Sequence, residues 1–313
     1  TNCARRHYQA ICIMVNKKNH TSVTDPNQME LTLSRPLELD RNFHLGGKSF
    51  YFFDFDDNVA YLSTPVVIFH KDTGKEVLLS SGEFARVNRD VGKSGQFKDY
   101  FMDFCDAKGT FRNFRDKDFS LAQRLTGKKQ SFIQDIETAI KSGLDWKAPS
   151  WNSFYHATYN QRPLSVITAR GHRAETIKEG ISLMVKEGHL PKVPNWLSVF
   201  AVSNPDVRKS LGDTDLVQSV AELKRAAIRE SVEEAIRKYG HSDFHRFGMS
   251  DDDEGNIELI VEEMKVLKQK YPNMSFFVIQ TFEDSFIKWE VLEHKTRNII
   301  SRSESSKAQM NLF

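Results

Sequence analysis

The first polar cluster of the chain is Asp54-Phe55-Asp56-Asp57-Asn58, in which two carboxylates stand two residues apart. A carboxylate can attack phosphorus as a nucleophile, and a second carboxyl group can protonate the leaving oxygen and later deprotonate water. Solvated surface turns contain the same pattern, so this cluster alone does not establish a site. It defines a chemistry that the rest of the chain has to support: phosphoryl transfer through an aspartate.

A second cluster, Thr168-Ala169-Arg170-Gly171-His172, joins a hydroxyl group to a run of backbone N–H groups. A turn of this composition between a strand and a helix can bind phosphate oxygens. The alternative is a simple helix cap, in which the hydroxyl satisfies free amide groups at the start of the helix. The cluster is therefore a candidate phosphate site only if it lies close to the first one.

The third cluster is acidic and contains Asp251 and Asp252 within residues 251–254, all of which are Asp or Glu. Neighbouring carboxylates repel one another unless a cation lies between them, and oxygen ligands suit Mg²⁺. An EF-hand calcium loop is excluded, because Asn256 or Ile257 stands where that loop requires glycine. A solvated loop that caps the following helix is the alternative to a metal site.

A bound phosphoryl group also requires a nearby cation. Lys224 is the preferred candidate, because it lies on a predicted helix that precedes the acidic cluster. Lys209, Arg208 and Lys192 are its rivals, and a solvated lysine without a role is the alternative.

The elements that must position these clusters follow from apolar patterns. Short apolar runs predict strands, and each polar cluster lies at the end of one of them. The predicted strands are residues 49–55, 163–168, 197–202, 244–249 and 275–279. Apolar residues at helical spacing predict intervening helices over 174–188, 219–239 and about 257–267. This alternation predicts an α/β fold with a parallel sheet, helices on both faces, and ligands beyond the carboxyl ends of the strands.

The alternation of strands and helices is interrupted between the first two strands, where the segment of residues 65–150 is too long for a crossover loop. This segment contains a predicted hairpin around Asp72-Thr73-Gly74 and a predicted helix at 131–142. We therefore expect an insertion that covers the site. The predicted division of the chain is a core of residues 45–64 and 151–297, an insertion of residues 65–150, and disordered tails of residues 1–44 and 298–313.

The composition is ordinary for one or two globular domains: of 313 residues, 39% are hydrophobic and 27% are charged. The net charge of +2 produces no global field that favours nucleic acid or an acidic membrane. Three scattered cysteines form no disulfide framework, which favours a reducing compartment. No apolar run approaches the ~20 residues of a membrane helix. We expect a cytoplasmic protein without a nucleic-acid or membrane partner.

The insertion carries basic and aromatic residues of uncertain role. Its basic residues could contact an anionic substrate, although a solvated basic face is the simpler explanation; they include Lys93, Lys98, Arg112, Arg115 and Lys117. Phe97, Tyr100 and Phe101 are predicted to lie in a core.

Taken together and in this order, the clusters resemble the four motifs of the haloacid dehalogenase-like hydrolase superfamily. The resemblance covers residues 49–64 and 163–280 and implies a Rossmann-like sheet with a cap-like insertion after the first strand. It implies that Asp54 is the nucleophile and that Asp56 is the general acid and base. Thr168 would bind a phosphoryl oxygen, and Lys224 would be the motif lysine.

The resemblance also implies ligands for Mg²⁺ and for the substrate. The metal would be held by Asp54, Asp251 and Asp252 and by the backbone carbonyl of Asp56. Loop residues would contact the substrate phosphate; these are Phe55, Ala169 and Arg170. Two positions depart from the family pattern: Asn58 stands where Thr or Val is usual, and Asn256 replaces a frequent Asp.

The expected activity is Mg²⁺-dependent hydrolysis of a small phosphate monoester through an aspartyl-phosphate on Asp54. Asp56 argues against dehalogenation, because a departing halide needs no proton. Two alternatives remain open at this point. One is a phosphotransferase or mutase with the same nucleophile, and the other is a binding protein that keeps the fold without turnover.

Overall fold

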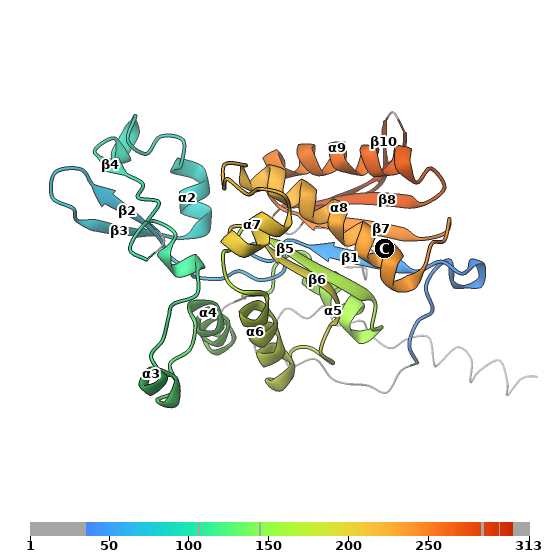
Figure 1. The fold of residues 1–313 in the computed structure, drawn as a ribbon, viewed down its shortest axis with the longest axis horizontal. Helices are drawn as coiled ribbons and strands as arrows, with labels where there is room; N and C mark the ends of the chain where they lie inside the picture. Colours follow the sequence, from blue (N-terminus) through green and yellow to red (C-terminus); the bar gives the residue numbers. More distant parts are fainter. Residues whose placement is uncertain (1–35, 106, 144, 283–284, 294, 303–313) are drawn as a thin grey trace, which may run out of the picture.

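The computed structural model describes residues 36–105, 107–143, 145–282, 285–293 and 295–302. At its centre lies a seven-stranded sheet in the order β10-β9-β8-β7-β1-β5-β6 (Figure 1). The five strands from β8 to β6 run parallel, while β9 and β10 continue the sheet antiparallel. Their bounds are β1 Ser49–Phe53, β5 Pro163–Thr168, β6 Asn195–Ala201, β7 Arg246–Asp251, β8 Ser275–Phe282, β9 Ser285–Val291 and β10 Thr296–Arg302. The predicted mixed α/β class with a mostly parallel sheet is confirmed.

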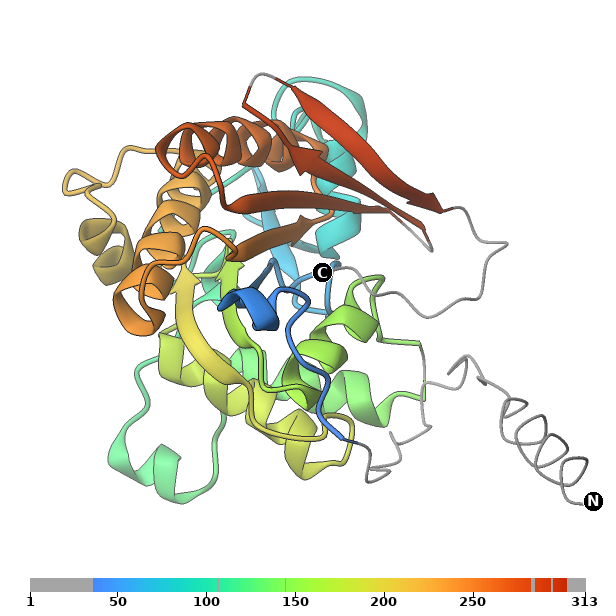
Figure 2. The ribbon, with the colours of Figure 1, turned by 90° about the vertical axis from the view of Figure 1, so that its right-hand side faces the viewer.

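Helices cover both faces of this sheet, as Figure 2 shows from the side. One face packs against α8 (Val220–Tyr239) and α9 (Glu254–Lys270). The other packs against α5 (Trp151–Tyr159) and α6 (Ala174–Lys186), and α4 (Ser131–Lys141) packs against α6. A short helix, α7 (Pro205–Ser210), follows β6.

Strand β1 shows why the sheet is buried on both sides. Its side chains are 3% exposed or less along its whole length. Phe50 and Phe52 pack with α8 and α9, whereas Tyr51 and Phe53 pack with α5 and α6. An uninterrupted apolar run is required by this position, because successive side chains of a strand point to opposite faces.

The segment between β1 and β5 begins with a smaller unit around β2, β3, β4 and α2, at one end of the large sheet and on the left in Figure 1, and ends with α4 and α5, which belong to the main unit. The predicted hairpin is present as two antiparallel strands, and a third strand pairs with the first of them. The elements of the segment that precede α4 are β2 Val66–His70, β3 Glu76–Leu79, α2 Ser81–Val87, η2 Gly95–Phe97, β4 Tyr100–Phe101, η3 Arg112–Phe114 and α3 Leu121–Leu125. The core of the smaller unit is small, with Ile68, Leu79 and Val91 as the buried members.

The described chain begins earlier than predicted. Asp40 forms an ion pair with Arg162, at 2.8 Å from Oδ1 to Nη1, and accepts a hydrogen bond from the Ser49 amide. A short 3-10 turn, η1 (Phe43–Leu45), then leads into β1. The predicted disordered tail of residues 1–44 is therefore too long, and residues 1–35 lie outside the described part.

The last two strands of the sheet, β9 and β10, were not predicted. β9 and β10 form an antiparallel hairpin beyond β8, and β10 continues to Arg302. The prediction of a frayed tail from Asn298 is wrong for residues 298–302, and residues 303–313 lie outside the described part. No helix within the described ranges is both long and apolar enough to span a membrane.

Candidate functional site

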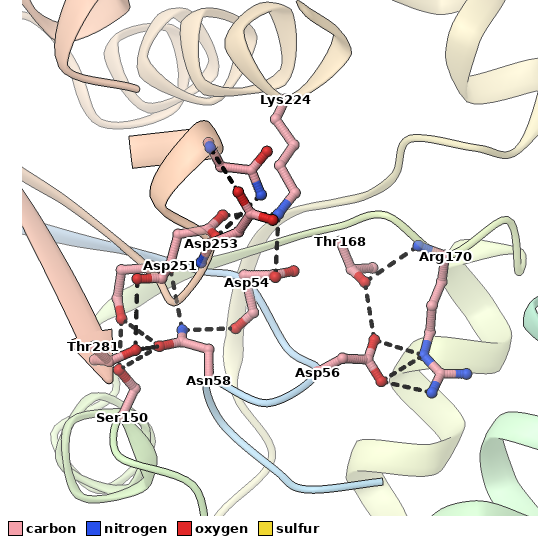
Figure 3. A network of polar contacts seen from close by, with 12 residues as sticks. Asp54, Asp56, Asn58, Ser150, Thr168, Arg170, Lys224, Asp251, Asp253 and Thr281 are labelled. Carbon is pink, nitrogen blue, oxygen red and sulfur yellow. Dashed lines mark hydrogen bonds and ion pairs between the residues drawn. The ribbon is translucent and has the colours of Figure 1, made fainter. Parts of the chain in front are cut away.

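The three polar clusters meet where β1, β5 and β7 end, as Figure 3 shows. Asp54 follows the last residue of β1, and Thr168 and Asp251 are the last residues of β5 and β7. The strands are neighbours in the sheet, and the Asp54 amide donates a 2.9 Å hydrogen bond to the Ser250 carbonyl. Parallel pairing in this register brings side chains that are distant in the sequence to one edge.

An acidic group with one lysine lies at this edge. One oxygen from each of Asp54, Asp251 and Asp252 can be chosen so that all three lie within 4.8 Å of one another. Lys224 Nζ lies 3.1 Å from Asp54 Oδ2 and 2.7 Å from Asp251 Oδ2 (Figure 3). A capping box at Ser219 starts α8. Lys224 lies in the second turn of this helix and points to the ends of β1 and β7.

The charges of this group are not balanced. Burial, reinforced by the neighbouring carboxylates, raises the pKa of Asp54 to about 7 and the pKa of Asp252 to about 8, although Lys224 opposes both changes. Burial also disfavours the charge of Lys224, but Asp251 and Asp54 outweigh it and raise the pKa of the ammonium group. One cation thus faces three carboxylates, an arrangement that a divalent cation would stabilise.

The residues present fit such a cation. Asp54 Oδ1 is buried, and no hydrogen-bond donor within the described ranges reaches it. A buried oxygen without a partner is costly unless a ligand satisfies it. Asp54, Asp251 and Asp252 supply only oxygen, which suits Mg²⁺ better than softer metals.

The residues of the acidic loop have two different roles. Asp251 Oδ1 accepts hydrogen bonds from Asn256 Nδ2 at 3.1 Å and from the Asp253 amide at 3.0 Å. Asp253 caps α9, with its Oδ1 3.0 Å from the Asn256 amide. Helix capping therefore explains Asp253, while Asp251 and Asp252 belong to the acidic group. Asn256, noted as a departure from the family pattern, orients Asp251.

Asn58, the other departure, is the centre of a buried network. Its side-chain amide donates to the carbonyls of Asp54 and Ser250 at 3.0 and 3.1 Å. Its oxygen accepts from the hydroxyl groups of Ser150, Ser250 and Thr281 at 2.8–2.9 Å. All of these side chains are satisfied and hold the loop after β1 against α5, β7 and β8 (Figure 3). Sequence reasoning missed Ser150 and Thr281, because only a common partner at Asn58 joins them.

Asp56 points away from the acidic group and toward the second cluster (Figure 3). Arg170 Nε and Nη2 donate to its carboxylate at 2.8 and 2.6 Å, and the Thr168 hydroxyl lies 3.4 Å from Oδ2. The next residue, Asp57, has a left-handed backbone with φ 57° and accepts a 2.8 Å hydrogen bond from Ser81 at the start of α2. The loop after β1 therefore presents successive carboxylates to different partners.

The predicted substrate contacts lie in three different environments. Ala169 is exposed beside Thr168, as a substrate contact requires. The ring of Phe55 is buried against Phe132 and Phe154, so its backbone is the part that a ligand could contact. The Arg170 side chain has no exposed surface. The prediction that Arg170 contacts the substrate is therefore wrong for its side chain, because Asp56 occupies its guanidinium.

The rivals of Lys224 have other partners. Arg208 forms an ion pair with Asp213 at 2.6 Å, and Lys192 Nζ lies over the Tyr159 ring. Lys209 is exposed. Lys224 is thus the candidate cation that reaches Asp54.

The basic and aromatic residues of the segment between β1 and β5 are largely structural or solvated. Lys93 and Lys98 are exposed, and Arg112 pairs with Glu76 at 2.7 Å. Phe97 and Tyr100 pack on the small core as predicted, whereas Phe101 is 42% exposed and does not.

A pocket of about 320 Å³ lies between this segment and the residues that follow β6. Phe104 and Phe111 form part of its wall, opposite Pro205 and Leu216. Arg115 also lines it and is held to the core by a 3.4 Å hydrogen bond from Nη1 to the Ser203 carbonyl. Comparison with known proteins finds no match for the chain among protein-family models, curated proteins or solved structures.

Proposed function

We propose that this protein is a Mg²⁺-dependent phosphatase of the haloacid dehalogenase-like type, which hydrolyses a phosphate monoester through an aspartyl-phosphate on Asp54. The observation that carries the proposal is the state of Asp54: its Oδ1 is buried without a partner within the described ranges, beside Lys224 and two further carboxylates. This combination suits a nucleophile that shares its site with a cation and a phosphoryl group.

In the proposed reaction, Asp54 is the nucleophile and Asp56 is the general acid and base. A carboxylate oxygen of Asp54 attacks phosphorus, and the bond between phosphorus and the leaving oxygen breaks as Asp56 gives that oxygen a proton. Water then attacks the phosphorus of the aspartyl-phosphate while Asp56 takes up a proton. The bond to Asp54 breaks, and inorganic phosphate and the original carboxylate result.

The remaining residues of the site would bind and orient. Lys224 offsets negative charge next to Asp54, and the Thr168 hydroxyl and the exposed loop at Ala169 lie on the Asp56 side of the site. Asp54, Asp251 and Asp252 would hold Mg²⁺, with the Asp56 backbone carbonyl as a further ligand. When bound, the ion would neutralise charge on the phosphoryl oxygens and fix their orientation.

The finer description of the fold belongs to the same proposal. Carboxylates at the ends of neighbouring parallel strands occupy the place where Rossmann-like folds bind ligands. The segment between β1 and β5 would then act as a cap-like insertion. The proposed substrate is a small phosphorylated molecule. The protein itself is proposed to be cytoplasmic and to act without a nucleic-acid or membrane partner.

Turnover of an aryl phosphate by the purified protein in Mg²⁺ tests the proposal. We expect Asp54→Asn to lower kcat roughly a thousandfold or more, because the amide is a poor nucleophile. Asp72→Asn, in the exposed turn between β2 and β3, is the matched control and should keep full activity. Equal rates for the wild type and Asp54→Asn would rule the proposal out.

Metal binding can be tested without turnover. A ligand that binds the folded protein raises its melting temperature, so Mg²⁺ should raise the Tm of the wild type. Asp252→Asn removes one ligand and should abolish most of that rise, whereas Asp72→Asn should retain it. A Tm that Mg²⁺ leaves unchanged in the wild type would contradict the assigned metal site.

A further inference from the structure

Arg170 is bound to Asp56 in a way that fixes a carboxylate. Its Nε lies 2.8 Å from Oδ2 and its Nη2 lies 2.6 Å from Oδ1 (Figure 3). Two parallel hydrogen bonds from a planar guanidinium set the direction of a carboxylate as well as its distance. The Asp56 side chain nevertheless remains 21% exposed, so a ligand can reach the carboxylate.

Other residues hold the guanidinium from its remaining sides. The rings of Phe114 and Phe132 lie over Arg170, with centroids 4.9 and 4.8 Å from Cζ. Nη2 also donates to the Thr64 hydroxyl at 2.6 Å, and that hydroxyl in turn donates to Asp135. Aromatic faces attract a cation, most strongly where water is excluded. Arg170 follows β5, whereas Phe114, Phe132 and Thr64, and Asp135 behind Thr64, all lie between β1 and β5 in the sequence.

This environment leaves no route for a substrate to the guanidinium. Arg170 has no exposed side-chain surface, and its Nη1 is buried without a hydrogen-bond partner in the described part of the chain. A phosphoryl oxygen would have to displace Asp56 or an aromatic ring to form a contact. Both changes would break strong interactions of a buried cation.

We infer that Arg170 is a positioning residue for the proposed phosphatase reaction. It holds the Asp56 carboxyl group where this group can exchange a proton with the leaving oxygen and with water. Arg170 acts through Asp56 and does not touch the substrate. The inference rests on the proposed function, because it assigns Arg170 to the acid–base step of that reaction.

Substrates with different leaving groups distinguish positioning from substrate binding. An alkoxide must be protonated as it departs, whereas nitrophenolate needs little help. The value of kcat/KM reports the steps up to the aspartyl-phosphate, so it isolates this requirement. We expect Arg170→Met to lower kcat/KM for an alkyl phosphate by roughly 10²- to 10⁴-fold, as loss of general acid catalysis does. The loss for nitrophenyl phosphate should be at least tenfold smaller, by the same reasoning.

Two further variants of the same site sharpen the test. In an Asp56→Asn background, Arg170→Met should lower kcat/KM for the alkyl phosphate little further, because both changes remove one function. Arg170→Lys should lose less than Arg170→Met, since lysine keeps a cation but lacks the two-pronged geometry.

Arg162 provides a matched control. It forms a buried ion pair with Asp40, at 2.8 Å, in which both side chains are 9% exposed. Arg162→Met therefore removes a comparable pair without touching Asp56. We expect this variant to leave the ratio of kcat/KM for the two substrates unchanged, whatever it does to stability.

The outcomes separate the inference from the proposed function. If Arg170→Met lowers kcat/KM equally for both substrates, and if this loss adds to that of Asp56→Asn, Arg170 has only a structural role and the inference is overturned. A variant that raises KM and leaves kcat unchanged would overturn it as well. Absence of any turnover that depends on Asp54 in the wild type would overturn both proposals. Circular dichroism checks the folding of each variant, and Arg170→Lys supplies the comparison if Arg170→Met does not fold.

Discussion

At the scale of single residues, burial determines which charges the fold tolerates. His172 has no exposed surface and packs against Phe132, with ring centroids 5.8 Å apart. Its Nε2 lies 3.2 Å from the Ser131 hydroxyl. Burial, together with the positive charges of Arg170, Arg115 and Lys117, lowers the pKa of this histidine to about 2. The folded protein therefore keeps His172 neutral well below neutral pH.

A stability measurement can detect this neutral histidine. Below its ordinary pKa of 6.5 the unfolded chain binds a proton at His172 that the folded chain does not. The free energy of unfolding should therefore fall as the pH drops below about 6.5, by up to about 1.4 kcal/mol per pH unit from this one group. Denaturant titrations at pH 7 and pH 5 measure this decrease in the free energy of unfolding. The decrease should be smaller for His172→Gln than for the wild type.

An exposed histidine serves as the control for that comparison. His241 is 55% exposed, so His241→Gln should keep the pH dependence of the wild type. If His172→Gln and the wild type lose the same stability between pH 7 and pH 5, the buried imidazole is not the cause.

The order of the polar clusters, together with their resemblance to a known set of motifs, predicted Asp54, Asp251, Asp252 and Lys224 as one group. These signals were not enough to predict the direction of each side chain. Arg170 was expected at the substrate, but its guanidinium turns inward to Asp56. The aromatic rings that hold it come from distant sequence, so no local pattern around residue 170 could reveal them.

At the scale of elements, the close approach of α4 and α6 depends on Gly180. A Cβ atom built at this position would lie 2.6 Å from Cε1 of Phe132 and 2.9 Å from Cδ1 of Ile136. Contacts of that length require the side chains of Phe132 and Ile136, or the helix that carries them, to shift. The phenyl ring of Phe132 also contacts Arg170, so this helix contact supports the site from outside.

We expect Gly180→Ala to destabilise the protein. Alanine favours the helix by about 1 kcal/mol over glycine, but overpacking a core costs about 1–3 kcal/mol. Gly82 in α2 is the matched control, because a Cβ there has no atom within 4 Å. Gly82→Ala should leave the free energy of unfolding unchanged or raise it by up to about 1 kcal/mol. Denaturant titration measures both, and a stabilised Gly180→Ala would contradict the packing described.

Strands that are buried on both faces were predicted well, because an unbroken apolar run such as that of β1 has few other interpretations. β9 was missed, although its first four side chains alternate between half-buried and buried. Lys288 and Glu290 lie within it and obscure the apolar signal. Prediction from one sequence therefore found the centre of the sheet more readily than its antiparallel edge.

At the scale of the whole molecule, two large clusters of buried side chains enclose the main sheet, and a third is much smaller. The small cluster belongs to the segment between β1 and β5 and contains Ile68, Leu79 and Val91. Chain length alone indicated that this segment is more than a connection. Its contacts with Arg170 and Ser203 could not be predicted, because they join parts far apart in sequence.

The difference in core size predicts a difference in local stability. Regions with few buried apolar contacts open without global unfolding, so β2 and β3 should exchange their amide hydrogens faster than β1 and β5. We expect a difference of roughly tenfold or more, equivalent to about 1.4 kcal/mol. Hydrogen exchange measured by mass spectrometry tests this, and equal protection of both sheets would show that the molecule opens as one unit.

The position of Phe114 against Arg170 connects this local stability to the proposed chemistry. Phe114 ends η3, which contacts β2 of the small sheet. If the small sheet separates from the core and takes η3 with it, Arg170 loses one of its two aromatic partners, and its hold on Asp56 should weaken. Asp54 and Lys224, which lie at the end of β1 and on α8 of the main unit, would stay in place. Mild denaturant or a modest rise in temperature would then reversibly lower the proposed phosphatase activity, through misalignment of the proposed proton donor Asp56, before the fold is lost.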